Sequence, residues 1–164
     1  MGVGFEPWQA ACQGANTTTF PYGASYVAGS CNGADYQAAR GMTPSTIPTG
    51  SAGACVSTFS STAKLFDMSG NVKEWVATDL TSTKPPSNPS CTTPPCLFEM
   101  RGGAYDISSF AVNGTTTAPG LQCDASVSAP YSTTVSGGTT TTQGIDVRLP
   151  SVGFRCCLPG MLPP

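Results

Sequence analysis

Apolar positions in this chain fall into short groups separated by long polar runs. Within Glu6–Gly14, the side chains of Trp8, Ala11 and Cys12 recur at helical spacing. This spacing predicts a short helix that turns one face toward the core. A second short helix is predicted over Tyr36–Arg40, where a glycine follows the last residue.

Short strands are predicted at Leu97–Arg101 and Val152–Leu158. The runs Met42–Ser61 and Thr81–Pro95 consist mainly of Pro, Ser, Thr, Gly and Ala, which predicts loops. Ser132–Gly144 is a low-complexity Thr/Gly tract and predicts an exposed excursion. The pattern therefore favours one loop-rich α+β domain with few regular elements.

Composition excludes several classes of function. Only 10% of residues are charged, the net charge is -2, and no run of Lys or Arg could neutralise phosphates, so a nucleic-acid role is excluded. No apolar stretch approaches the roughly 18 residues that a membrane span needs. The chain has no histidine, which removes Ser-His and Cys-His catalysis and every histidine-containing metal site.

Cysteines form an even set of eight, which predicts four disulfides in an oxidising compartment. We therefore expect an extracellular or cell-surface location, or the bacterial periplasm, with an export signal upstream of the first residue. A zinc site made of four thiolates is the alternative, although it usually needs two close cysteine pairs. The cysteines are Cys12, Cys31, Cys55, Cys91, Cys96, Cys123, Cys156 and Cys157.

An acidic turn carries the most informative chemistry. Asp67 and Glu74 stand seven positions apart around a Ser-Gly-Asn bend that ends at Trp75. Calcium takes about six to eight oxygen ligands, which carboxylates and turn carbonyls can supply without histidine or thiolate. An ordinary solvated loop is the alternative interpretation.

The same turn resembles the signature of a known family. Residues 67–75 read Asp-Met-Ser-Gly-Asn-Val-Lys-Glu-Trp, similar to the signature of the formylglycine-generating-enzyme (sulfatase-modifying-factor) family. Three further marks follow the family's order: Trp-Gln-Ala-Ala-Cys at 8–12 with Phe-Pro-Tyr-Gly at 20–23, Arg-Gly-Gly-Ala-Tyr at 101–105, and Gly-Phe-Arg-Cys at 153–156. The resemblance implies a variant of the C-type-lectin fold.

The resemblance also implies a calcium site. Asp67 and Glu74 would bind the ion through their side chains, and Gly70 and Val72 through their carbonyl oxygens. Asn32 matches the start of a second family calcium site, but no acidic partner follows it in the next loop. The marks imply one domain over residues 1–164 that begins partway into the family domain, so that another chain would supply the missing N-terminal portion.

The catalytic centre of the family has no match. Family catalysts carry two cysteines in C-x4-C spacing between the Arg-Gly-Gly and Gly-Phe-Arg marks, where paired thiolates bind copper(I). Here that interval contains Cys123 alone. Cys91 and Cys96 have the right spacing but precede Arg101, and the two prolines between them favour a disulfide-closed loop.

Copper is therefore not expected, and the resemblance implies a secreted, non-catalytic structural or ligand-binding domain. One alternative is a divergent copper-dependent oxidase in which folding brings a partner to Cys123. The other is a subunit of an extracellular assembly or filament, in which a second chain covers exposed core surface.

Overall fold

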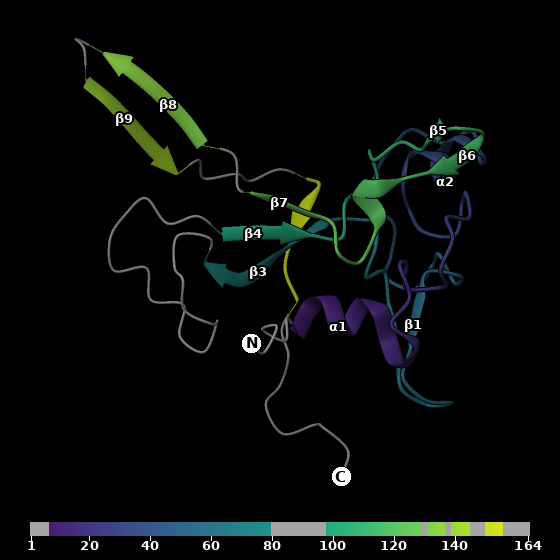
Figure 1. Ribbon diagram of the computed structural model, residues 1–164. Coiled ribbons are helices and arrows are strands. Elements are labelled where there is room, and N and C mark those ends of the chain that lie inside the picture. The colour runs from purple at the N-terminus through teal and green to yellow at the C-terminus, as the bar shows by residue number, and fades with distance from the viewer. Residues whose placement is uncertain (1–6, 80–97, 129–130, 137–138, 145–149, 156–164) are drawn as a thin grey trace.

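The computed structural model describes residues 7–79, 98–128, 131–136, 139–144 and 150–155. Short helices and strands are joined by long irregular segments, as the α+β prediction expects (Figure 1). In chain order the elements are α1 (Pro7–Gln13), the 3₁₀ turn η1 (Gly14–Asn16), α2 (Ala34–Ala38), β1 (Val56–Thr58), β2 (Lys64–Phe66), β3 (Lys73–Asp79), β4 (Phe98–Arg101), β5 (Phe110–Val112), β6 (Thr115–Thr117), the 3₁₀ turn η2 (Pro119–Leu121), β7 (Ser126–Ser128), β8 (Tyr131–Ser136), β9 (Thr139–Gly144) and β10 (Val152–Gly153).

The largest sheet has the strand order β10-β3-β4-β7. β10 runs parallel to β3, whereas β3 with β4 and β4 with β7 are antiparallel pairs. In this register Gly153 pairs with Glu74, and Glu74 pairs with Arg101. Three sequence marks that lie far apart in the chain therefore occupy one row across the sheet.

Both predicted helices are present. α1 spans Pro7–Gln13 and packs Trp8, Ala11 and Cys12 into one core cluster, as their spacing predicts. α2 starts at Ala34, two residues before the prediction, because its first turn follows directly on Gly33 at the N-cap. The strand predicted at Leu97–Arg101 is confirmed as β4.

Other predicted elements need correction. The run Met42–Ser61, predicted as a loop, contains β1, which pairs with β2 in an antiparallel hairpin. The Ser132–Gly144 tract, predicted as an excursion, is not contradicted: it belongs to a regular hairpin of β8 and β9, because β-branched threonine suits a strand. Figure 1 shows this hairpin extending away from the four-stranded sheet.

The last predicted strand is shorter than expected. Only Val152–Gly153 form β10, and Phe154 and Arg155 follow without strand structure. Residues 156–158 and the predicted loop Thr81–Pro95 lie outside the described residues.

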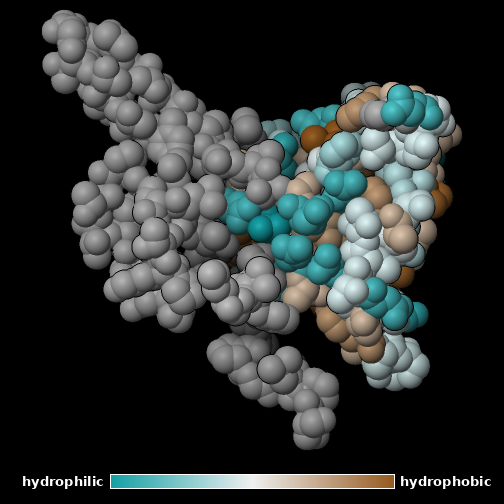
Figure 2. Space-filling view, in the orientation of Figure 1, coloured by the Kyte–Doolittle hydropathy of each residue, from teal (hydrophilic) through white to brown (hydrophobic). Residues whose placement is uncertain are grey.

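The buried apolar residues form small clusters, each held by a different set of segments. One contains Cys31, Tyr36, Ala52 and Cys55; the second contains Cys12, Met68 and Cys123; the third contains Phe20, Ala118 and Leu121. Large apolar side chains that remain exposed, such as Phe110 and Phe154, are scattered. Figure 2 shows the same on one face, where the brown residues do not gather into a single patch. No helix in the described part of the chain is long and apolar enough to cross a membrane.

Candidate functional site

The acidic turn is buried, so the solvated-loop interpretation is wrong. Asp67 and Glu74 are each 3% exposed, and Ser69 between them is fully buried. The Gly70 N–H donates to the carbonyl oxygen of Gly102 at 2.7 Å, and the Asn71 N–H donates to that of Asn32 at 2.8 Å. The turn therefore joins segments that are remote in sequence.

Gly70 is required by this packing. Its φ is +73°, and a Cβ at this position would lie 2.6 Å from the carbonyl oxygen of Asn32. The next side chain, Asn71, accepts a hydrogen bond from the Ile47 N–H at 3.0 Å and donates one to the Ile47 carbonyl at 3.1 Å. This closely packed joint explains the Gly-Asn pair of the signature without any ligand.

The carboxylate of Glu74 contacts side chains from two other sequence marks, Trp8 and Arg155. The indole Nε1–H of Trp8 donates to Glu74 Oε2 at 2.8 Å, and Arg155 Nε lies 2.7 Å from Oε2 and 2.6 Å from Oε1. Arg155 also donates from Nη2 to the carbonyl oxygen of Asp67 at 2.6 Å. Three sequence marks thus meet at one partly buried ion pair.

Asp67 has one satisfied and one unsatisfied carboxylate oxygen. Oδ2 accepts a hydrogen bond from the Gly50 N–H at 2.7 Å, while Oδ1 is buried and has no hydrogen-bond partner among the described residues. Burial raises the pKa of Asp67, and the Gly50 N–H and the Arg155 charge offset this only in part. A buried carboxylate of this kind is stabilised by a proton or by a cation.

The predicted calcium ligands fit an ion unequally. Asp67 has a free oxygen, and turn carbonyls are the kind of donor that calcium accepts. Glu74 is already engaged by Arg155 and Trp8, so the guanidinium supplies positive charge at this place. The described residues hold no group of three or more His, Cys, Asp or Glu side chains, so a site here would rest largely on backbone carbonyls.

Four cysteines are paired in the described part of the chain. Cys12 bonds to Cys123, and Cys31 bonds to Cys55, which confirms the disulfide prediction for these four and excludes a zinc site made from them. The predicted disulfide-closed loop between Cys91 and Cys96 lies outside the described residues, as do Cys156 and Cys157.

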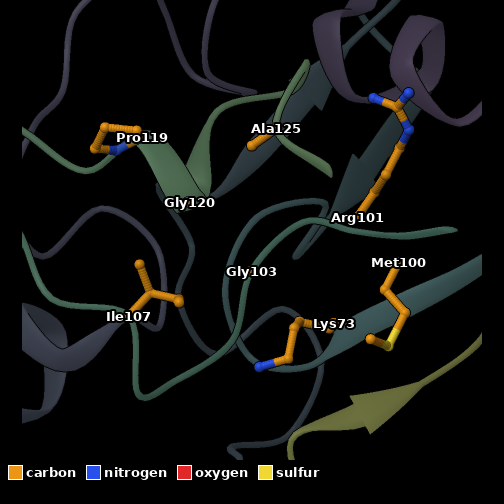
Figure 3. A pocket seen from close by; sticks show the side chains of 8 residues that line it. All are labelled: Lys73, Met100, Arg101, Gly103, Ile107, Pro119, Gly120 and Ala125. Atoms are coloured by element: carbon orange, nitrogen blue, oxygen red, sulfur yellow. The ribbon is translucent and has the colours of Figure 1, made fainter. Parts of the chain in front are cut away.

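A cavity of about 240 Å³ opens beside the Arg-Gly-Gly mark. Figure 3 shows Lys73 extending toward it, whereas the guanidinium of Arg101 points away from Lys73. Arg101 instead pairs with Glu99 at 3.1 Å. Among the described residues no cysteine lines the cavity, and those that do are Lys73, Met100, Arg101, Gly103, Ile107, Pro119, Gly120 and Ala125.

Comparison with known proteins settles the family. A scan against protein families matches residues 5–158 to the sulfatase-modifying factor enzyme 1-like domain. The chain belongs to this family. Its C-type-lectin-like, loop-rich fold agrees with the few helices and small sheets of this sulfatase-modifying-factor-like domain. Searches of curated proteins and of solved structures found no match.

The sequence motif indicates Asp67 and Glu74 but not the side chains that surround them. Trp8 and Arg155 were recognised as parts of family marks, yet their contacts with Glu74 were not predicted. A usable signal was present, because the side chains of Trp8 and Arg155 can both donate a hydrogen bond to a buried acid. The cavity beside Lys73 had no signal in the sequence.

Proposed function

We propose that this sulfatase-modifying-factor-like domain is an extracellular, non-catalytic ligand-binding domain. The observation that carries the proposal is the Cys12–Cys123 disulfide. Cys123 is the only cysteine between the Arg-Gly-Gly and Gly-Phe-Arg marks, and it is fully buried. Paired cysteines are also consistent with an oxidising compartment outside the cytoplasm.

Copper chemistry does not fit this arrangement. Copper(I) prefers soft thiolate ligands, and a thiolate is also the nucleophilic form of cysteine. A disulfide sulfur is neither a thiolate ligand nor a nucleophile. Folding brings Cys12 to Cys123, and the bond between them leaves Cys123 without a thiol. Of the described residues that line the cavity beside Lys73, Met100 alone carries sulfur.

The oxidised protein should neither retain copper(I) nor oxidise a thiol. We would equilibrate it with copper(I) and a colorimetric copper(I) chelator, and incubate it under air with a cysteine-containing peptide. All copper should pass to the chelator, and the peptide should keep its mass. Stoichiometric copper retention or peptide oxidation that a C12S/C123S variant loses would overturn the non-catalytic assignment.

We also propose that calcium binds at the Asp67 end of the turn. The support is the buried Oδ1 atom, which has no partner among the described residues, together with the family resemblance, which implies the carbonyl oxygens of Gly70 and Val72 as further ligands. Glu74 would have to give up part of its contact with Arg155 to join the site. Calcium would then stabilise the fold and would take no part in a reaction.

Asp67→Asn separates calcium binding from the cost of burying a charge. Because the pKa of Asp67 is raised above its ordinary value of 3.8, its charge destabilises the metal-free fold increasingly as pH rises through the folded-state pKa. Asparagine removes that charge and tolerates the φ of +54° at this position. In chelator at pH 7, D67N should therefore melt no lower than the parent protein.

Calcium should raise the melting temperature of the parent protein only. At a hundredfold excess over Kd the gain is about 2.7 kcal/mol. Thermal melts of both proteins, with calcium and with chelator, measure it. An equal response of parent and variant, or no response of the parent, would remove calcium from this turn.

A further inference from the structure

A second cavity, of about 310 Å³, lies between the end of α1 with η1, the turn at residues 20–23, and β1. Its walls combine amides, hydroxyls, one phenol and small apolar groups, and none of them is charged. The lining residues are Gln13, Asn16, Thr18, Pro21, Tyr22, Ala54, Val56 and Thr58. We propose that this cavity binds a neutral polyhydroxylated ligand, a single saccharide ring, which rests on the ligand-binding part of the proposed function.

The polar groups of this cavity can both donate and accept hydrogen bonds. The side chains of Gln13, Asn16 and Thr58 make no hydrogen bond to another residue in the described part of the chain. The Tyr22 hydroxyl accepts a hydrogen bond from the Val27 N–H at 3.3 Å, which leaves its own proton to donate. Neighbouring hydroxyls of a sugar ring need this mixture of donors and acceptors.

Tyr22 also offers an apolar surface in a fixed orientation. Its ring stacks on Phe20 with centroids 5.5 Å apart and an interplanar angle of 13°. One ring face is therefore covered, and the ring is held against the core cluster of Cys31 and Cys55. A tyrosine with an apolar body and a polar tip suits a ligand whose ring has C–H faces and a hydroxylated edge.

The walls of the cavity are preorganised by both disulfides. Gln13 directly follows Cys12, and Ala54 and Val56 stand on either side of Cys55. A wall that is already rigid loses little conformational entropy when a ligand binds. The volume is at the lower end of the roughly 300–1,000 Å³ range of small-molecule sites, which favours one ring over a longer chain.

An extended peptide is a poorer fit. Strand addition needs a free sheet edge, but β1 pairs with β2 on one side and packs against η1 on the other. A Cβ on Gly14 would lie 2.8 Å from the Thr58 carbonyl oxygen, and the Ser57 hydroxyl donates to the carbonyl oxygen of Ala11. The close packing of η1 against β1 therefore disfavours the addition of a peptide strand at this edge.

A charged ligand would find no counterion among the described residues that line the cavity. The nearest basic residue along the hairpin is Lys64, which pairs with Thr58 in the strand register but does not line the cavity. A neutral sugar should therefore bind better than its acidic or amino counterparts, because desolvating a charge without a partner is unfavourable.

Nuclear magnetic resonance of the oxidised protein tests the site directly. Glucose, galactose and N-acetylglucosamine are titrated as neutral probes, with glucuronate and glucosamine as charged ones. At least one neutral sugar should shift the side-chain amide signals of Gln13 and Asn16 saturably. Thr58→Val should weaken that binding about 3- to 10-fold, as expected for one lost hydrogen bond.

Matched variants keep the test independent of folding. Thr116→Val changes an exposed strand threonine on β6 that does not line the cavity, and it should leave the affinity unchanged. Asn16→Ala removes an exposed amide and should weaken binding without loss of signal dispersion. The saccharide site is overturned if no neutral sugar shifts these signals, if a charged sugar or a Ser/Thr-rich peptide binds more tightly, or if the shifts map to the cavity beside Lys73. The copper assay reports on the non-catalytic assignment separately, so the two failures are distinguishable.

Discussion

At the scale of single residues, Glu74 shows how much can depend on one carboxylate. Its side chain is 4% exposed, and its contacts come from residues 66 positions earlier and 81 positions later in the chain. A buried charge with a hydrogen-bonded partner contributes little net stability, but the loss of one partner leaves the other charge uncompensated. Glu74 therefore matters chiefly because Arg155 depends on it.

Replacing Glu74 with glutamine should lower the free energy of unfolding by about 2–3 kcal/mol, less than for a fully buried pair because Arg155 keeps some solvent contact. Urea denaturation measures the change. Asp106→Asn is the control, because Asp106 is half-exposed and lies 3.9 Å from Lys73, and it should cost less than about 0.5 kcal/mol. Equal losses in the two variants would show that Glu74 has no such role.

At the scale of elements, the 67–75 turn is a joint between the loops that carry Asn32, Ile47 and Gly102. Such a joint leaves no room for an added methyl group at Gly70. The same left-handed backbone occurs at Gly29, where φ is +75° and no atom lies within 4 Å of a built Cβ. Alanine variants at the two positions therefore distinguish the free-energy cost of backbone strain from that of steric overlap.

Gly29→Ala should cost about 1–2 kcal/mol, the penalty of a left-handed conformation. Gly70→Ala should cost about 1–3 kcal/mol more, because the methyl group overlaps the backbone of Asn32. Chemical denaturation of both variants gives the difference. If the two losses are the same, packing does not fix the glycine of the signature.

Helices and strands that are defined by local sequence could be predicted, whereas those that depend on pairing with another segment could not. α1 has a clear apolar face, and β4 is a strand bounded by turn residues. β1 and β5 are each three residues long, which is too short for an alternating pattern to register, and their pairing depends on the neighbouring strand. At the site, the acids of the turn followed from the motif, but Arg155 did not, because its contact spans 81 residues.

At the scale of the whole molecule, disulfides take the place of a large apolar core. In the described part of the chain, two of the three core clusters are built around a cystine. A chain with 19 glycines and 15 prolines has few large apolar side chains to bury. Covalent links that restrict the unfolded state offset this shortage.

Removing the Cys12–Cys123 disulfide should lower the free energy of unfolding more than removing the Cys31–Cys55 disulfide. The Cys12–Cys123 bond closes 111 positions and the Cys31–Cys55 bond 24, so loop-closure entropy predicts losses of about 5 and about 3.5 kcal/mol. Paired alanine variants compared by denaturation measure both, and the cavities they leave are similar because all four cysteines are buried. A larger loss for the Cys31–Cys55 variant would mean that local packing, rather than chain entropy, dominates.

The meeting of the family marks at Glu74 has a consequence for how such sequences are interpreted. Trp8, Glu74 and Arg155 form one structural unit, while the segment that distinguishes an oxidase lies elsewhere, between Arg101 and Gly153. Selection for a folded scaffold alone would preserve every mark and leave that segment free to diverge. A genome search for these sequence marks therefore finds proteins that share this fold. If our proposal is correct, only some of those proteins are oxidases.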